Sequence, residues 1–156
     1  LVSSKIILLS WIKLMALIID TINSGKALMK FKEMVAAQGG DITYIEEPDA
    51  FSKAQYVVPV YSTDAGNIES IDTDMVGSIA RYLGAGRMKD DSEIDKTAGI
   101  VLEKKIGDYV ESGGVLAYIH TNDENKVLGA TQNLKTAFNL TNKKVVVPKS
   151  RVLDIM

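Results

Sequence analysis

The residues best suited to binding an anion lie in one short run, Leu83-Gly84-Ala85-Gly86-Arg87, with Lys89 close behind. Glycines let backbone N–H groups approach an anion, and arginine offers planar donors suited to carboxylates, carbonyls and phosphate. A phosphate loop normally follows a strand and opens a helix, whereas this run ends a helical pattern and opens a polar loop. This order of elements favours a helix end over a phosphate loop. The alternative is that Arg87 and Lys89 reach another domain or an anionic ligand.

The remaining titratable residues do not form a catalytic or metal-binding pattern. His120 is the only histidine, and its place at a predicted strand end is typical of a surface or hydrogen-bonded residue, so no histidine zinc site is expected. Glu46-Glu47 and Asp72 with Asp74 fit a turn and a helix start. The acidic run from Asp90 to Asp95 lacks the spacing of a calcium loop. We therefore predict no catalytic residue and no metal site.

The composition narrows the class of protein. The chain has 156 residues, of which 46% are hydrophobic and 24% charged, with a net charge of -2. This length suits one domain, or a small domain with an extra piece. The slightly negative charge gives no basis for nucleic-acid binding. The absence of cysteine excludes disulfides, thiolate zinc sites and a cysteine nucleophile, and fits a cytoplasmic protein.

The first 19 residues are strongly apolar. A membrane span needs about 20 apolar residues with few charges, and Lys5 and Lys13 interrupt this segment. A signal peptide is the other targeting alternative, but no small-residue cleavage site follows the apolar run. A helix buried in a larger domain is therefore favoured over a membrane or targeting role. Because the sequence starts at Leu1 rather than at methionine, we expect a fragment or a processed chain.

The next segment predicts a second helix. Asn23 or Ser24 can cap its start, and the Gly39-Gly40 pair can end it. Between them lies an apolar stripe at helical spacing, formed by Leu28, Phe31, Met34 and Val35. We therefore predict a helical segment over residues 1–40 and a connector over residues 41–54, where turn-prone and polar residues gather.

Residues 55–156 predict a mixed domain. One predicted helix begins at Asp72 or Thr73 and stops at Gly84, and a second begins at Asn122 or Asp123 and runs through Phe138. Pro59 indicates an edge position or a bulge in the first strand. Strands and helices alternate without a regular rhythm, so the sequence predicts an α+β fold. The predicted strands are residues 56–61, 67–71, 100–102, 115–119 and 144–147.

Several of these features, taken in order, resemble the pyrimidine-nucleoside phosphorylase family, which includes thymidine phosphorylase. The resemblance runs from about Asp20 to Val147. Glu103 departs from the family, whose members often carry histidine there, and residues 1–19 match poorly. The matching features are the helix of residues 25–41, Ile68 to Asp72, Leu83 to Arg87, Ile94-Asp95, Gly99-Ile100, Lys104-Lys105, Gly107-Asp108, Val110 and Gly113.

This resemblance implies an α/β-hammerhead domain with a barrel-like strand core after Ala54, preceded by the last helices of a central α/β domain. It implies a cytoplasmic, homodimeric parent enzyme that carries out reversible phosphorolysis of pyrimidine nucleosides to the base and a pentose 1-phosphate. Phosphate is then a co-substrate, no cofactor is expected, and the remaining domains of the parent are the partners.

The family's phosphate and base contacts lie upstream of the region matched here, so the resemblance gives this chain no catalytic, phosphate-binding or base-binding residue. The chain alone is therefore expected to be inactive. Closure between two domains excludes water from the reaction. The resemblance leaves Gly84, Gly86, Arg87 and Lys89 as candidate interdomain closure contacts.

A free-standing carrier or interaction module is the alternative function. Residues 105–114 and the apolar strand after them resemble the hairpin of lipoyl and biotinyl carrier domains. Asp95-Lys96-Thr97 resembles the modified lysine turn, but it precedes this hairpin, and no lysine turn follows residues 115–120. A membrane-anchored domain is a third hypothesis, which rests on residues 1–19.

Overall fold

The computed structural model describes the backbone of residues 2–87 and 93–147, with side chains from Trp11 onward. The chain divides into two compact units. The first, unit 1, spans Leu1–Ser52, and the second, unit 2, spans Lys53–Met156.

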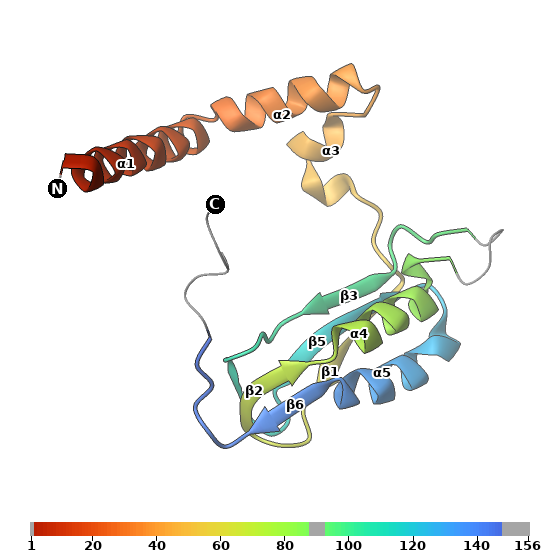
Figure 1. The fold of residues 1–156 in the computed structure, drawn as a ribbon. Coiled ribbons are helices and arrows are strands. Elements are labelled where there is room, and N and C mark those ends of the chain that lie inside the picture. Colours follow the sequence, from red (N-terminus) through yellow and green to blue (C-terminus); the bar gives the residue numbers. More distant parts are fainter. Residues whose placement is uncertain (1, 88–92, 148–156) are drawn as a thin grey trace. The chain divides into compact units, whose positions relative to one another are not determined.

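Unit 1 is helical (Figure 1). It contains α1 (Val2–Asn23), α2 (Lys26–Ala37), the short helix α3 (Thr43–Glu46) and a single 3-10 turn, η1 (Pro48–Ala50). The prediction of two successive helices over residues 1 to about 39 is confirmed. The segment predicted as a connector carries α3 and η1, and the rings of Tyr44 and Phe51 stack there with centroids 4.7 Å apart.

The two ends of α2 differ in how well the sequence predicts them. A start capped by Asn23 or Ser24 is wrong, because Gly25 takes the capping position in the left-handed region, at φ 76, without any side-chain cap. The predicted end at Gly39-Gly40 is confirmed. The Gly39 amide donates to the Ala36 carbonyl at 3.0 Å and the Gly40 amide to the Val35 carbonyl at 2.9 Å. These two bonds satisfy carbonyls that the helix end would leave open.

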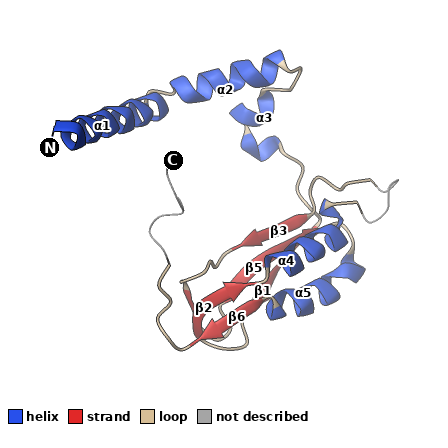
Figure 2. Cartoon of the chain, viewed as in Figure 1, coloured by secondary structure: helices blue, strands red, loops and turns tan. Residues whose placement is uncertain are grey.

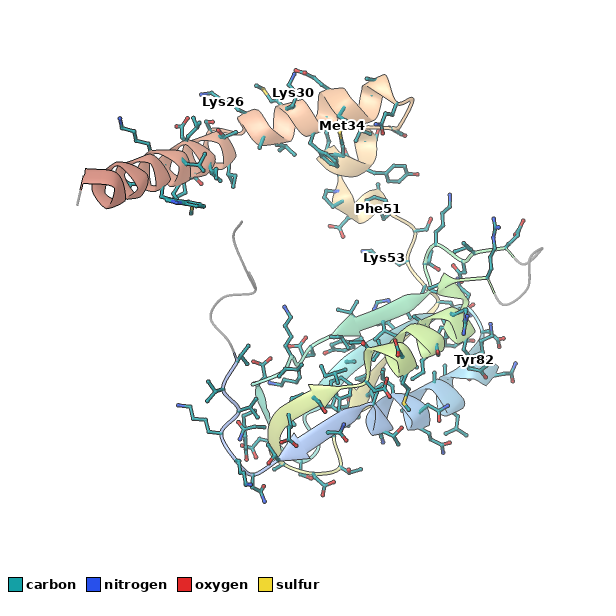
Figure 3. The ribbon with its side chains drawn as sticks, in the orientation of Figure 1. Lys26, Lys30, Met34, Phe51, Lys53 and Tyr82 are labelled. Carbon is teal, nitrogen blue, oxygen red and sulfur yellow. The ribbon has the colours of Figure 1, made fainter. Side chains whose placement is uncertain are left out.

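Most of the described apolar side chains of α1 and α2 are exposed. Figure 3 shows side chains projecting from the described parts of both helices, and Leu17 and Ile22, for example, are 61% and 63% exposed. None of the described side chains of α2 is buried. Within the described part of the chain, no helix combines the length and apolar character needed to cross a membrane.

The described residues of unit 2 form six strands in two three-stranded antiparallel sheets, drawn in red in Figure 2. The α+β class is confirmed. The barrel-like core is a wrong prediction, because each set of three strands forms a separate open sheet with the orders β1-β5-β3 and β4-β2-β6. The strands are β1 (Tyr56–Tyr61), β2 (Gly66–Ile71), β3 (Gly99–Leu102), β4 (Tyr109–Val110), β5 (Val115–Thr121) and β6 (Phe138–Thr141).

Two helices lie among the described residues of unit 2. Helix α4 (Thr73–Ala80) continues into one wide turn, η2 (Arg81–Ala85), and a 3-10 turn, η3 (Glu124–Lys126), leads into α5 (Val127–Thr136). The predicted cap of α4 is confirmed, since the Asp72 carboxylate accepts from the Met75 amide at 2.9 Å. Helix α5 packs on β1 and β5 and touches α4. The core between helices and strands includes Ile68, Ile79, Leu83, Leu116, Ile119 and Leu134.

The last part of unit 2 corrects two predictions. Phe138 does not extend the helix but begins β6, where it pairs with Ile71 of β2 and is only 5% exposed. Residues 144–147 form no strand, and Val146 is 83% exposed. Their β-branched composition favours a strand, but a strand also needs a partner, and no described strand pairs with these residues.

Candidate functional site

Gly84 lies at the end of the helix that leads into the candidate contact residues. Its backbone has φ +128, in a region that side-chain-bearing residues avoid, and its carbonyl accepts from the Asp95 amide at 2.9 Å. A Cβ at this position would lie 3.2 Å from the Asp95 Cβ and 3.3 Å from the Ala98 Cβ. The predicted helix end is therefore confirmed, and the close approach of the 95–98 turn requires glycine.

Three polar side chains, those of Asp95, Thr97 and Asn122, and the backbone amide of Gln55 form a hydrogen-bonded network that we call the polar junction. The Asn122 Oδ1 accepts from the Gln55 amide at 2.7 Å, and its Nδ2 donates to the Asp95 Oδ2 at 2.8 Å and to the Thr97 Oγ1 at 2.8 Å. The Asp95 Oδ1 accepts from the Thr97 amide at 2.9 Å and from the Thr97 hydroxyl at 2.8 Å. The junction thus joins the start of β1, the 95–97 turn and the end of β5.

These donors stabilise the ionised form of Asp95. The Thr97 amide, then the Thr97 hydroxyl and the Asn122 amide, lower the pKa of Asp95 below its ordinary value. A lowered pKa means that this carboxylate contributes stability above the ordinary pKa, and that the contribution is lost as the pH falls through the lowered value. Near neutral pH, Asp95 is therefore a hydrogen-bond acceptor and not a proton donor.

A buried hydroxyl ties the same region to the core. Thr121 is fully buried at the end of β5, and its Oγ1 donates to the Leu83 carbonyl at 3.2 Å. The same oxygen accepts from the Asp123 amide at 3.2 Å. The end of this helix is therefore fixed by two hydrogen bonds. The buried Thr121 hydroxyl donates to the Leu83 carbonyl, and the Asp95 amide donates to the Gly84 carbonyl.

The predicted contact residues fall on one short segment after α4. Arg87 is exposed and makes no ion pair with another described residue. A Cβ at Gly86 would lie 3.2 Å from the Arg81 Cγ, so the chain folds back closely on η2 there. Lys89 lies outside the described residues. The structure thus places Gly84, Gly86 and Arg87 together, at a helix end that a buried and a surface hydrogen bond both fix.

Sequence reasoning missed Asn122 and Gln55 as members of this region. The sequence predicts Asn122 only as an alternative helix cap, and that role belongs to Asp123, which accepts from the Asn125 amide at 3.0 Å. The one available signal is three adjacent polar residues, Thr121 to Asp123, after an apolar strand. That pattern shows a polar strand end but gives no indication of its distant partners.

The other titratable residues stay apart. His120 lies within β5, opposite Val57 of β1 and Gly99 of β3. Among the side chains that the structure describes, no three acidic or histidine residues gather as a metal site would require. After β5 the chain enters η3, where the Lys126 Nζ lies 3.9 Å from the Asp123 Oδ2 and over the Tyr82 ring.

The chain after β5 also bears on the carrier-domain alternative. It is helical there, which differs from the lysine turn that a carrier domain would have after this strand.

The requirement for glycine at position 84 can be tested against a second glycine of the same helix. Gly84→Ala is expected to lower the unfolding free energy of unit 2 by about 1–3 kcal/mol, from backbone strain and crowding against the 95–98 turn. Gly77→Ala is the matched control, because Gly77 lies in α4 and a Cβ added there would meet no atom within 4 Å. That change should raise stability by about 0.5–1 kcal/mol. Equal urea midpoints for the two variants would contradict the argument.

The family match falls within unit 2. Residues 67–141 match the family described as pyrimidine nucleoside phosphorylase C-terminal domain. The pyrimidine-nucleoside phosphorylase of Staphylococcus aureus strain USA300 is 44% identical over 107 residues, which are 69% of this chain and 25% of that protein. The protein of that name from the bovine strain RF122 is 43% identical over the same length. The chain spans about a quarter of the length of these curated relatives.

Proposed function

We propose that this chain acts as the C-terminal part of an enzyme that cleaves pyrimidine nucleosides with phosphate, because residues 67–141 match the pyrimidine nucleoside phosphorylase C-terminal domain family. The observation that carries the proposal is 44% identity over 107 residues to an enzyme of that name. In this proposal the two sheets with α4 and α5 are the α/β-hammerhead domain, and phosphate is the co-substrate of a cytoplasmic, homodimeric parent.

The chemistry assigns unit 2 a supporting role. Phosphate attacks the anomeric carbon of the nucleoside, the bond to the base breaks, and the products are the free base and a pentose 1-phosphate. Water competes with phosphate as acceptor, so a site that closes and excludes water favours phosphorolysis. The part that this chain contributes is a surface that closes on the rest of the enzyme.

The segment from Gly84 to Arg87 is the best candidate for that surface. Its start is fixed by the Gly84–Asp95 and Thr121–Leu83 hydrogen bonds, and its end carries an exposed arginine. A fixed backbone lowers the entropy lost when a contact forms. A guanidinium group then offers paired donors to a carboxylate, a carbonyl or a phosphate across the closing surface.

The chain alone is expected to show no phosphorolysis. The described residues do not assemble a nucleophile with a general base. Their one candidate for binding an anion is the segment from Gly84 to Arg87. The assay is release of uracil or thymine from uridine or thymidine by the purified chain, with and without phosphate. Phosphate-dependent release above a blank without protein would contradict the prediction.

Arg87 can be tested in a chimera in which the matching segment of the Staphylococcus aureus enzyme is replaced by that of this chain. Arg87→Ala should leave the stability of unit 2 within about 0.5 kcal/mol, as expected for an exposed side chain, but should lower the turnover of the chimera. Lys143→Ala is the control, because it removes one exposed positive charge from another segment. A stability loss of several kcal/mol would make Arg87 structural, and unchanged kinetics would remove its proposed role.

A further inference from the structure

Asn122 uses both ends of its amide to join segments that are far apart in the chain. Its oxygen accepts from the Gln55 amide, 67 residues away, and its nitrogen donates to the Asp95 carboxylate, 27 residues away. Gln55 is among the first residues of unit 2, since the division between the units falls after Ser52. Asp95 in turn donates its amide to the Gly84 carbonyl.

The proton assignment in this network has one solution. The Gln55 backbone amide can only donate, so the oxygen of Asn122 must face it, and the NH₂ group must face Asp95 and Thr97. The Thr97 hydroxyl gives its proton to the Asp95 carboxylate and accepts from Asn122 with a lone pair. Only a primary amide at position 122 supplies one acceptor and two donors in these directions.

We propose that Asn122 is a positioning residue, which couples the chain as it enters unit 2 to the segment from Gly84 to Arg87. The coupling runs from the Gln55 amide through the Asn122 side chain to Asp95, and from the Asp95 amide to the Gly84 carbonyl. The importance of this coupling for phosphorolysis rests on the function proposed above. The coupling itself does not, because it concerns bonds within unit 2.

The location of these bonds argues against a purely stabilising role. The side chain of Asn122 is exposed, as is Gln55, and exposed hydrogen bonds contribute little to global stability because water replaces them. What the bonds fix is the relative position of three segments. Losing them should therefore change local opening near Gly84 and Gln55 more than it changes the unfolding midpoint.

Two substitutions separate the two halves of the coupling. Asn122→Ala removes both contacts. Asn122→Asp keeps an acceptor for the Gln55 amide, but it replaces the donor to Asp95 with a second carboxylate, which repels the first. Asn139→Ala is the matched control, because this asparagine makes one exposed side-chain bond, to the Ser70 hydroxyl at 2.9 Å.

The measurement is amide hydrogen exchange by NMR at neutral pH in the intact chain. In Asn122→Ala, the amides of Gln55 and Asp95 should both exchange about three to ten times faster, as expected for the loss of one net hydrogen bond. In Asn122→Asp, the Asp95 amide should exchange faster while the Gln55 amide keeps its protection. Asn139→Ala should leave both amides unchanged. Unchanged exchange at Asp95 in both Asn122 variants, or equal acceleration in the control, would overturn the coupling.

The catalytic consequence is tested separately in the chimera. If Asn122 acts through Arg87, the turnover lost in Asn122→Ala should shrink once Arg87→Ala is already present. Additive losses of turnover would overturn action through Arg87. If Arg87→Ala leaves phosphorolysis unchanged while the Asn122 variants still show the split exchange pattern, the proposed role of Arg87 fails and the coupling within unit 2 stands.

Discussion

Leu134→Ala is expected to lower the unfolding free energy of unit 2 by about 2–5 kcal/mol, from the loss of buried methyl groups and the cavity left behind. Leu134 is fully buried on the face of α5 that meets the strands, within a core that also contains Ile119 and Phe138. A loss of this size is a large fraction of the stability of an ordinary domain. Urea unfolding followed by circular dichroism measures it.

Leu128→Ala is the control for that experiment. It removes the same side chain from the same helix, but Leu128 is 68% exposed. Its expected effect is within about 0.5 kcal/mol. If both variants lose the same stability, the loss does not depend on burial at Leu134, and the packing argument is wrong. If neither loses stability, α5 does not cover the sheet as described.

Removal of residues 1–52 is expected to abolish self-association and to leave unit 2 folded. Every buried hydrophobic side chain that the structure describes belongs to residue 54 or later, so unit 2 has its own core. In unit 1, by contrast, large apolar side chains such as Trp11, Phe31 and Met34 are about half exposed. Exposed apolar patches of this kind promote association between copies.

Light scattering coupled to size-exclusion chromatography makes the comparison. At micromolar concentration the intact 17.0 kDa chain should form multimers, and the shortened chain should be a monomer with an unchanged urea midpoint. Two outcomes would contradict this expectation, and each has a clear meaning. Aggregation after the deletion would show that unit 1 protects unit 2, and unfolding would show that unit 1 supplies part of its core.

Local signals predicted local structure well. Pro59 indicated an edge strand or a bulge, and β1 is an outer strand whose register shifts between Val60 and Tyr61. Asp72 was a predicted cap, and Gly39 with Gly40 a predicted helix end. Each of these features depends on a few neighbouring residues, whose steric and hydrogen-bonding preferences are visible in the sequence itself.

Pairing between distant segments was not predictable in the same way. Ala137 and Phe138 continue the helical spacing of apolar residues in α5, which predicts a longer helix. Phe138 instead pairs with Ile71 of β2 and forms the start of β6. Whether strands close into a barrel depends on which strands pair, and no single strand carries that information. The glycine run was enough to predict a helix end at Gly84. The contacts of Asn122 were not predictable, because the segments that they join are far apart in the sequence.

The strand order also has a consequence for how the protein is made. Tyr56 of β1 pairs with Thr121 of β5, and Asn67 of β2 pairs with Thr141 of β6. At a synthesis rate of about 5–20 residues per second, the first strands wait on the order of several seconds for their partners. Domains dominated by such long-range pairing also fold slowly, in roughly milliseconds to seconds. Unit 2 therefore folds only as translation of the sheet nears completion, while the helices of unit 1 can form as they leave the ribosome.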